Sequence, residues 1–109
     1  MDSQQQNRWG YLVVWEFVVK PGMEAGFEEV YGPSGDWVRL FRKDENYLGT
    51  ELNRGQGDLF RYVTLDFWVS EKAYREFRKK HRDEYQVIDQ KCEQLTESER
   101  ELAKFIRTV

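Results

Sequence analysis

Hydrophobic and polar positions alternate along three segments of the chain, and this period of two predicts β-strands. The first segment, Tyr11–Val19, is β-branched or aromatic on both faces, which is typical of a central strand covered on both sides. The second is Tyr47–Arg54. The glycine-rich segment Gly55–Asp58 predicts a hairpin turn, after which a third strand begins at Leu59. We also expect a short closing strand over residues 103–109.

Between these strands, apolar residues recur three and four positions apart, which predicts helices. The first runs from Met23–Tyr31, and Asp36 is expected to cap a second, short helical piece. A long helix over Glu71–Leu95 follows Ser70, which we interpret as its N-cap. The spacing of Thr96–Glu99 is that of a capping box and predicts one more helical turn.

The predicted order of elements is strand, helix, strand, strand, helix, strand. Two halves of this kind form a ferredoxin-like βαββαβ fold of the α+β class, with an antiparallel sheet of order 4-1-3-2 and both helices on one face. The 109 residues suffice for one domain, which we expect over residues 10–109. Residues 1–9 are interpreted as a disordered N-terminal tail.

The two faces of the third strand differ in character. One face is aliphatic and aromatic, apart from Arg61, and we interpret it as core; it comprises Leu59, Val63, Leu65, Phe67 and Val69. The other face is larger and partly polar, and we interpret it as the uncovered face of the sheet. An open apolar face of this size predicts a homodimer with sheet packed on sheet and a ligand between the sheets. The predicted open face comprises Phe60, Tyr62, Thr64, Asp66 and Trp68 of the third strand and Leu12, Val14, Glu16 and Val18 of the first.

Composition and charge exclude several classes of function. The net charge of −3, from 17 basic and 20 acidic residues, argues against nucleic acid as a partner bound through bulk charge. No apolar run approaches the roughly 20 residues that span a bilayer, and the N-terminus lacks the apolar core of a signal peptide. The single cysteine, Cys92, allows no intrachain disulfide. We therefore expect a cytoplasmic protein without a membrane partner. One histidine and one cysteine also provide no cluster for a metal site.

The segments "YLVVWEFVVKPGMEAGF", "YLGTELNR", "RYVTLDFWVSEKAYREF" and "LTESERELAKF" resemble, in their succession, the antibiotic biosynthesis monooxygenase domain family. The resemblance runs from Gly10 to Ile106. It implies a dimeric α+β barrel that oxidises a hydroxylated aromatic or quinol with O2 and uses no metal or flavin cofactor. It further implies a pocket that deprotonates the substrate and stabilises the resulting electron-rich anion.

The same resemblance implies several site residues. Trp68 matches a Trp that is frequent at the end of the family's third strand, with Tyr62 and Thr64 on the same face. His81 lies in the second helix, where some members carry a functional His. A related branch degrades haem with an Asn on the first strand, but Tyr11–Val19 contains no Asn.

Two carboxylates, Asp66 and Glu16, stand in otherwise apolar strands. Burial would raise the pKa of either carboxyl and make it a usable general base. The alternative is that each pairs with a basic side chain such as Arg61 or Arg54, or is solvated at a strand end.

The leading hypothesis is thus a cofactor-independent monooxygenase-like protein that acts on a small aromatic molecule. Its catalytic candidates are Asp66 and His81. An alternative is a non-catalytic dimer that binds a small hydrophobic ligand or acts as a scaffold, and a third reading is haem binding through His81. For Trp68 and for His81, the alternative to a role in the site is a packing role alone. The substrate-binding candidates are Tyr62, Thr64, Trp68, Phe60 and Glu16.

Overall fold

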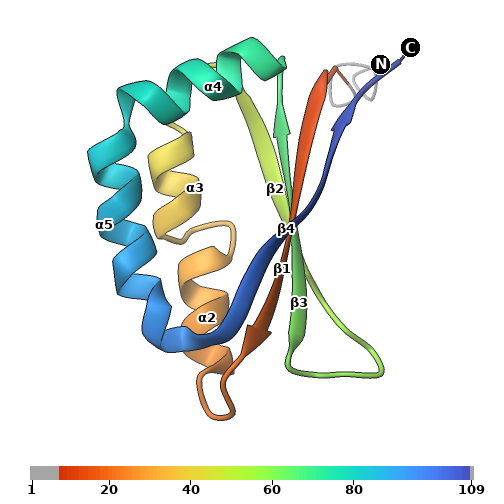
Figure 1. The fold of residues 1–109 in the computed structure, drawn as a ribbon, viewed down its shortest axis with the longest axis vertical. Coiled ribbons are helices and arrows are strands. Elements are labelled where there is room, and N and C mark those ends of the chain that lie inside the picture. The colour runs from red at the N-terminus through yellow and green to blue at the C-terminus, as the bar shows by residue number, and fades with distance from the viewer. Residues whose placement is uncertain (1–7, 109) are drawn as a thin grey trace.

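The computed structural model describes residues 8–108, which form a four-stranded antiparallel sheet with helices on one of its faces (Figure 1). The strand order β2-β3-β1-β4, with every neighbouring pair antiparallel, confirms the predicted ferredoxin-like arrangement. In chain order the elements are β1 (Tyr11–Val19), α2 (Glu24–Tyr31), α3 (Asp36–Phe41), β2 (Tyr47–Arg54), β3 (Arg61–Trp68), α4 (Glu71–Lys80), α5 (Arg82–Cys92), the short 3₁₀ helix η1 (Glu93–Leu95) and β4 (Thr96–Ile106).

The starts of two helices test the predicted caps. Ser70 caps α4 as expected, because its hydroxyl accepts a hydrogen bond of 3.1 Å from the backbone N–H of Ala73. The predicted cap of α3 is wrong. Asp36 is the first residue inside that helix, and its carboxylate is held by ion pairs with Arg39 and Lys91 instead of capping the backbone.

The long helix predicted over Glu71–Leu95 is also wrong, because it is interrupted at His81. The backbone there has φ −109° and ψ 28°, and α4 ends where α5 begins. A single straight helix of that length would extend about 37 Å at 1.5 Å per residue, close to the longest dimension of the molecule, 40 Å. The break lets α5 turn and run beside α3, as Figure 1 shows.

The extra helical turn predicted at Thr96–Glu99 is wrong, because β4 begins there. Thr96 pairs with Val19 and Glu99 pairs with Phe17. The predicted closing strand exists but is longer than expected. As the edge strand beside β1, it provides hydrogen-bond partners for backbone groups of β1 that would otherwise be unpaired.

The predicted assignment of the two faces is correct for β1 and wrong for β3. Directly paired residues share a face, and the register pairs Leu12 with Phe67 and Phe17 with Tyr62. The even-numbered residues of β3 therefore point toward the helices. Alternation alone did not reveal this, since both faces of β3 are rich in apolar residues. The large rings belong under the helices, where Trp68 and Tyr62 are among the largest fully buried side chains.

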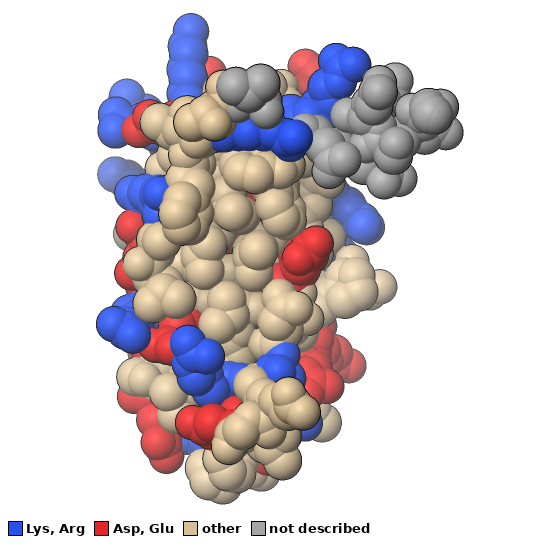
Figure 2. Space-filling model, turned by 90° about the vertical axis from the view of Figure 1, so that its right-hand side faces the viewer, with Lys and Arg blue, Asp and Glu red and all other residues tan. Residues whose placement is uncertain are grey.

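The face of the sheet that no helix covers is called the open face below. Figure 2 shows that neutral side chains occupy most of its middle, while charged side chains lie mainly toward its margins. Glu16 also lies on the open face, where it accepts hydrogen bonds from Arg61 and Arg100. The apolar part of the open face consists of Leu12, Val14, Val63, Leu65, Phe67, Ala103 and Phe105.

Most of the predicted N-terminal tail, residues 1–7, lies outside the described residues. Trp9, which was included in that tail, packs its ring 5.6 Å from the ring of Phe67. No helix in the described part of the chain is both long enough and apolar enough to span a membrane.

Candidate functional site

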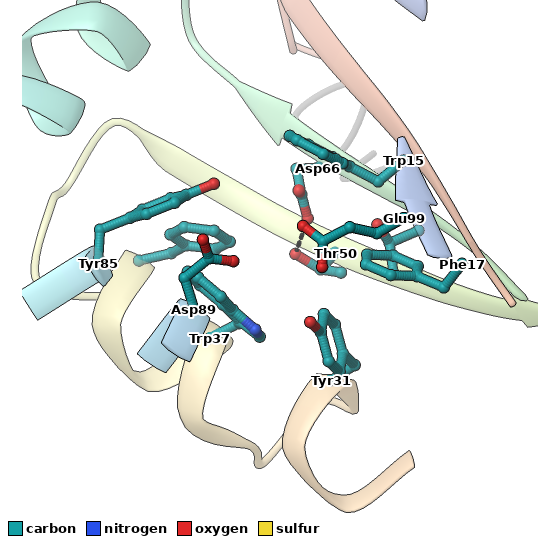
Figure 3. A pocket seen from close by; sticks show the side chains of 11 residues that line it. Trp15, Phe17, Tyr31, Trp37, Thr50, Asp66, Tyr85, Asp89 and Glu99 are labelled. Atoms are coloured by element: carbon teal, nitrogen blue, oxygen red, sulfur yellow. Dashed lines mark hydrogen bonds between the residues drawn. The ribbon is translucent and has the colours of Figure 1, made fainter. Parts of the chain in front are cut away.

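A small cavity lies between the sheet and the helices, and side chains from seven different elements surround it (Figure 3). Its volume is about 40 Å³. Aromatic rings form most of the wall, and three carboxylates and two threonines supply the polar groups. The lining residues are Trp15, Phe17, Tyr31, Trp37, Phe41, Thr50, Thr64, Asp66, Tyr85, Asp89 and Glu99.

Asp66 is the most buried carboxylate of the cavity, with 8 % of its surface exposed. Its Oδ1 accepts a hydrogen bond of 2.7 Å from the hydroxyl of Thr50. Burial raises the pKa of Asp66 to about 6, and the bond from Thr50 counteracts part of that effect. The alternative that Asp66 pairs with Arg54 or Arg61 is wrong. A carboxylate with this pKa is largely ionised at pH 7 and can accept a proton.

Thr50 links Asp66 to a second hydroxyl. The side-chain oxygens of Tyr47 and Thr50 lie 2.6 Å apart, so the three residues form a chain of hydrogen bonds along the β2 side of the cavity. Because Thr50 donates its single proton to Asp66, the hydroxyl of Tyr47 is the donor in the other bond. Burial raises the pKa of Tyr47 to about 12, so this phenol stays protonated at neutral pH.

Two further carboxylates, Asp89 and Glu99, lie on opposite sides of the cavity. Figure 3 shows Asp89 on the helix side, and Glu99 on the sheet side together with Asp66. Partial burial raises the pKa of Glu99, and the negative charges of Asp89 and Glu93 raise it further. The site is therefore acidic as well as aromatic.

The volume of the cavity limits what fits without movement. A cavity of about 150 Å³ holds benzene and one water occupies about 30 Å³ of liquid, so about 40 Å³ accommodates a water or a diatomic molecule. An aromatic ligand enters only when side chains of the wall move. Trp15 and Tyr85 are the partly exposed rings of the wall, and their rotation is the smallest change that would widen it.

Of the residues expected from the sequence, Thr64 and Asp66 line the cavity. Trp68 and Tyr62 share their face of β3 but are core residues on either side of it. Trp68 packs against Phe41 and other rings. The hydroxyl of Tyr62 donates a hydrogen bond to Glu28.

The other three expected residues lie elsewhere. His81 sits at the junction of α4 and α5, where its Nδ1 is 2.6 Å from a carboxylate oxygen of Glu84 and its ring contacts Phe77. Phe60 precedes β3 in the turn. Glu16 lies on the open face and pairs with Arg61, one of the two arginines that the alternative interpretation named, so this alternative is confirmed for Glu16.

Sequence reasoning missed the rings contributed by β1 and by the helices. Trp15 is directly paired with Thr64, so the two side chains lie on the same face of the sheet. Trp15 could have been identified as a cavity residue if the even-numbered residues of β3 had been assigned to the helix-covered face and the strand register had been known. The same applies to Thr50, which is paired with Asp66. Trp37 and Tyr85 belong to different helices, and their edge-to-face contact at 4.7 Å depends on the turn at His81, for which the sequence gives no signal.

Within residues 8–108, no group of three or more His, Cys, Asp or Glu side chains is arranged to hold a metal ion. The arrangement offers acid–base chemistry at Asp66 inside an aromatic wall. It resembles a site for a small, flat organic molecule more than a site for a phosphate or a metal.

The fold is that of the antibiotic biosynthesis monooxygenase-like proteins, and the resemblance seen in the sequence is thereby confirmed at the level of fold. No protein-family model matches the sequence, and a search of curated proteins finds no relative.

Three solved structures illustrate the likeness. SnoaB, a cofactor-independent oxygenase from Streptomyces nogalater, superposes with a TM-score of 0.73 at 17 % identity, over 93 % of this chain and 95 % of that one. A monooxygenase from the gene ActVA-Orf6 of Streptomyces coelicolor, solved with nanaomycin D, gives 0.71 at 18 % identity over 94 % and 90 %. A protein from Shewanella oneidensis gives 0.65 at 22 % identity over 93 % of each chain.

Proposed function

We propose that this protein is a monooxygenase that oxidises a small hydroxylated aromatic with O2, with Asp66 as the general base. The observation that carries the proposal is the buried Asp66 carboxylate, whose pKa is about 6, in a cavity walled by aromatic rings. A fold shared with cofactor-independent oxygenases supports the same assignment.

The chemistry needs only the substrate and O2. Asp66 takes the phenolic proton, and the resulting phenolate ring gives up electrons to O2. One oxygen atom forms a bond to a ring carbon and replaces its hydrogen, and the other leaves as water, so that phenol and O2 give a quinone and one water. The substrate supplies all four electrons that O2 accepts. The proton held by Asp66 goes into the water that leaves.

The walls supply binding and exclude water. Trp15 and Trp37 present large rings that can contact a flat substrate, and Thr64 offers a hydroxyl beside Asp66. Because the cavity of about 40 Å³ is smaller than an aromatic ring, substrate entry requires the wall to open, and closure afterward would shield the phenolate from solvent.

Oxygen uptake with a panel of phenols and hydroquinones tests this function, with quinone formation followed by absorbance. Uptake should occur without added metal or flavin, and Asp66→Asn should abolish it, because Asn cannot accept the proton. Asp83→Asn is the matched control, since the Asp83 side chain is exposed on α5 and does not line the cavity. Unchanged uptake by Asp66→Asn would remove this carboxylate from the mechanism.

We also propose that two copies pack through their open faces to form a homodimer. An apolar patch that includes the half-buried Leu65 and Phe67 and the exposed Phe105 lies on the face that no helix covers. Burying it against a second copy about a two-fold axis would remove it from water. Since the cavity lies on the opposite, helix-covered side of the sheet, each copy would keep its own site. This differs from the ligand space between sheets that the sequence suggested.

The small cavity favours one second candidate, a non-catalytic protein that binds a small hydrophobic ligand. Saturable binding of an aromatic molecule without oxygen uptake would support that function over the first. Haem binding through His81 has less support, because the His81 ring is engaged by Glu84 and Phe77 outside the cavity.

A further inference from the structure

We infer that the substrate of this site is a hydroxylated aromatic that carries a positively charged amine. The inference rests on the proposed function for the location of the site and adds the chemical class of its ligand. Three carboxylates, Asp66, Asp89 and Glu99, face the cavity, and no Lys, Arg or His is among the described residues that line it. A site built for a phenolate alone would place positive charge there.

The carboxylates of the site are not neutralised by the protein. Asp66 is nine-tenths buried, its Oδ1 is bonded to Thr50, and its Oδ2 has no hydrogen-bond partner among residues 8–108. Asp89 is half-buried and Glu99 is exposed, and within the same residues neither accepts a side-chain hydrogen bond or forms an ion pair. Lys91, two residues beyond Asp89 on α5, pairs with Asp36 instead.

Arg78 is a cation that interacts electrostatically with Asp89, but its guanidinium is engaged by other side chains. Its guanidinium donates a hydrogen bond of 2.8 Å to the hydroxyl of Tyr74 and lies 3.9 Å from the centre of the Tyr85 ring. Arg78 does not line the cavity. A positive charge inside the site therefore has to come with the ligand.

The aromatic wall suits an ammonium group as well as a flat ring. Trp is the side chain whose face attracts a cation most strongly, and Tyr follows. Trp15, Trp37 and Tyr85 stand around the same cavity as Asp89 and Glu99. Aromatic faces combined with carboxylates are the chemistry that recognises organic ammonium ions. A ligand without a positive charge forms no ion pair with Asp89 or Glu99.

The proposed reaction gives the positive charge a role beyond binding. Proton transfer to Asp66 removes one negative charge from the protein but creates another on the substrate oxygen. With Asp89 and Glu99 nearby, that phenolate is disfavoured by like charge. An ammonium group on the same molecule offsets their field, so the substrate supplies the cation that the protein lacks.

Three probes of similar shape test the inference by isothermal titration calorimetry at pH 7. Tyramine carries an ammonium, 4-propylphenol replaces it with a methyl group, and 3-(4-hydroxyphenyl)propionate replaces it with a carboxylate. We expect tyramine to bind about fivefold more tightly than 4-propylphenol, from cation–π and carboxylate contacts together, and the propionate to bind most weakly. Equal or tighter binding of either other probe, or no binding of tyramine, would overturn the inference.

Charge-neutralising variants test whether Asp89 and Glu99 cause the preference for tyramine. The double variant Asp89→Asn/Glu99→Gln should bring the affinity for tyramine to within about twofold of that for 4-propylphenol and leave the affinity for 4-propylphenol unchanged. Glu97→Gln is the matched control, since Glu97 is an exposed acid of β4 that does not line the cavity. An unchanged preference for tyramine in the double variant would show that the carboxylates do not select the cation.

Oxygen uptake with the same probes separates this inference from the proposed function. Preferential binding of tyramine without oxygen uptake by any probe would support the cationic ligand and reject the monooxygenase. Uptake that is fastest with 4-propylphenol would support the monooxygenase and reject the cationic substrate.

Discussion

The hydroxyl of Thr50 donates a hydrogen bond of 2.7 Å to the carboxylate of Asp66 across the pairing of β2 with β3. The strand register fixes the two residues opposite each other on the helix-covered face. Two opposing effects therefore act on one carboxyl, because burial raises its pKa and the Thr50 bond lowers it. The balance of the two determines the pH at which Asp66 becomes a base.

Replacing Asp66 with Asn should stabilise the protein at neutral pH. In the folded chain Asp66 keeps its proton up to about pH 6, whereas its ordinary pKa is 3.8. The folded state thus binds more protons between these values, and the free energy of unfolding falls as the pH rises through them. Urea titrations should show Asp66→Asn more stable than wild type by up to about 3 kcal/mol at pH 7.5, with little difference at pH 4.

The control for this prediction is Asp83→Asn, whose exposed carboxyl should leave the pH dependence of stability unchanged. If Asp66→Asn keeps the same decrease in stability between pH 4 and 6 as wild type, the pKa of Asp66 is not raised, and its assignment as a buried base fails.

Removing the Thr50 hydroxyl should move the pKa of Asp66 in a defined direction. In Thr50→Val the carboxylate loses its one hydrogen-bond donor while burial persists, so the pKa of Asp66 should rise above about 6. Side-chain ¹³C NMR titration of Asp66 measures this directly, and the acidic limb of the oxygen-uptake profile should shift to higher pH with it. Thr64→Val is the matched control, since Thr64 lines the same cavity without bonding to Asp66. Equal shifts in both variants would indicate a general change in the cavity.

The sequence was sufficient to predict the order and pairing of the strands. Period-two alternation located β1, β2 and β3, and the turn at Gly55–Asp58 joined two of them. The four-stranded order follows from that succession, because a strand–helix–strand unit repeated twice has few ways to pack.

The faces of β3 and the cavity were harder to predict, for a physical reason. The open face of β3 is as apolar as a buried face, and we propose that a second copy covers it. Its residues are Val63, Leu65 and Phe67. A chain whose two sheet faces are both apolar gives no polar side to mark the outside. Asp66 was identified from its chemistry alone, as a carboxylate in an apolar strand, even though the face assigned to it was wrong.

His81 shows the limit of reasoning from helical spacing. Its position in line with Phe77 and Tyr85 suggested one continuous apolar stripe, whereas the helix turns there. We predict that His81→Ala leaves oxygen uptake and tyramine binding unchanged and lowers the free energy of unfolding by about 1 kcal/mol, through loss of its contacts with Phe77 and Glu84. Loss of uptake, or of a haem absorption band, on this substitution would restore the role expected from the sequence.

If two copies pair through their open faces, a charge placed on that face should disrupt the dimer. Phe105 on β4 is 51 % exposed in the single chain, although it belongs to the apolar patch. Phe105→Lys should place a charge in the interface and convert the dimer to a monomer. Val87→Lys is the matched control, because Val87 is 66 % exposed on α5, on the opposite side of the sheet. Native mass spectrometry should give twice 13.2 kDa for wild type and Val87→Lys and a single 13.2 kDa chain for Phe105→Lys. A monomeric wild type would contradict the dimer, and the apolar open face would then need another partner.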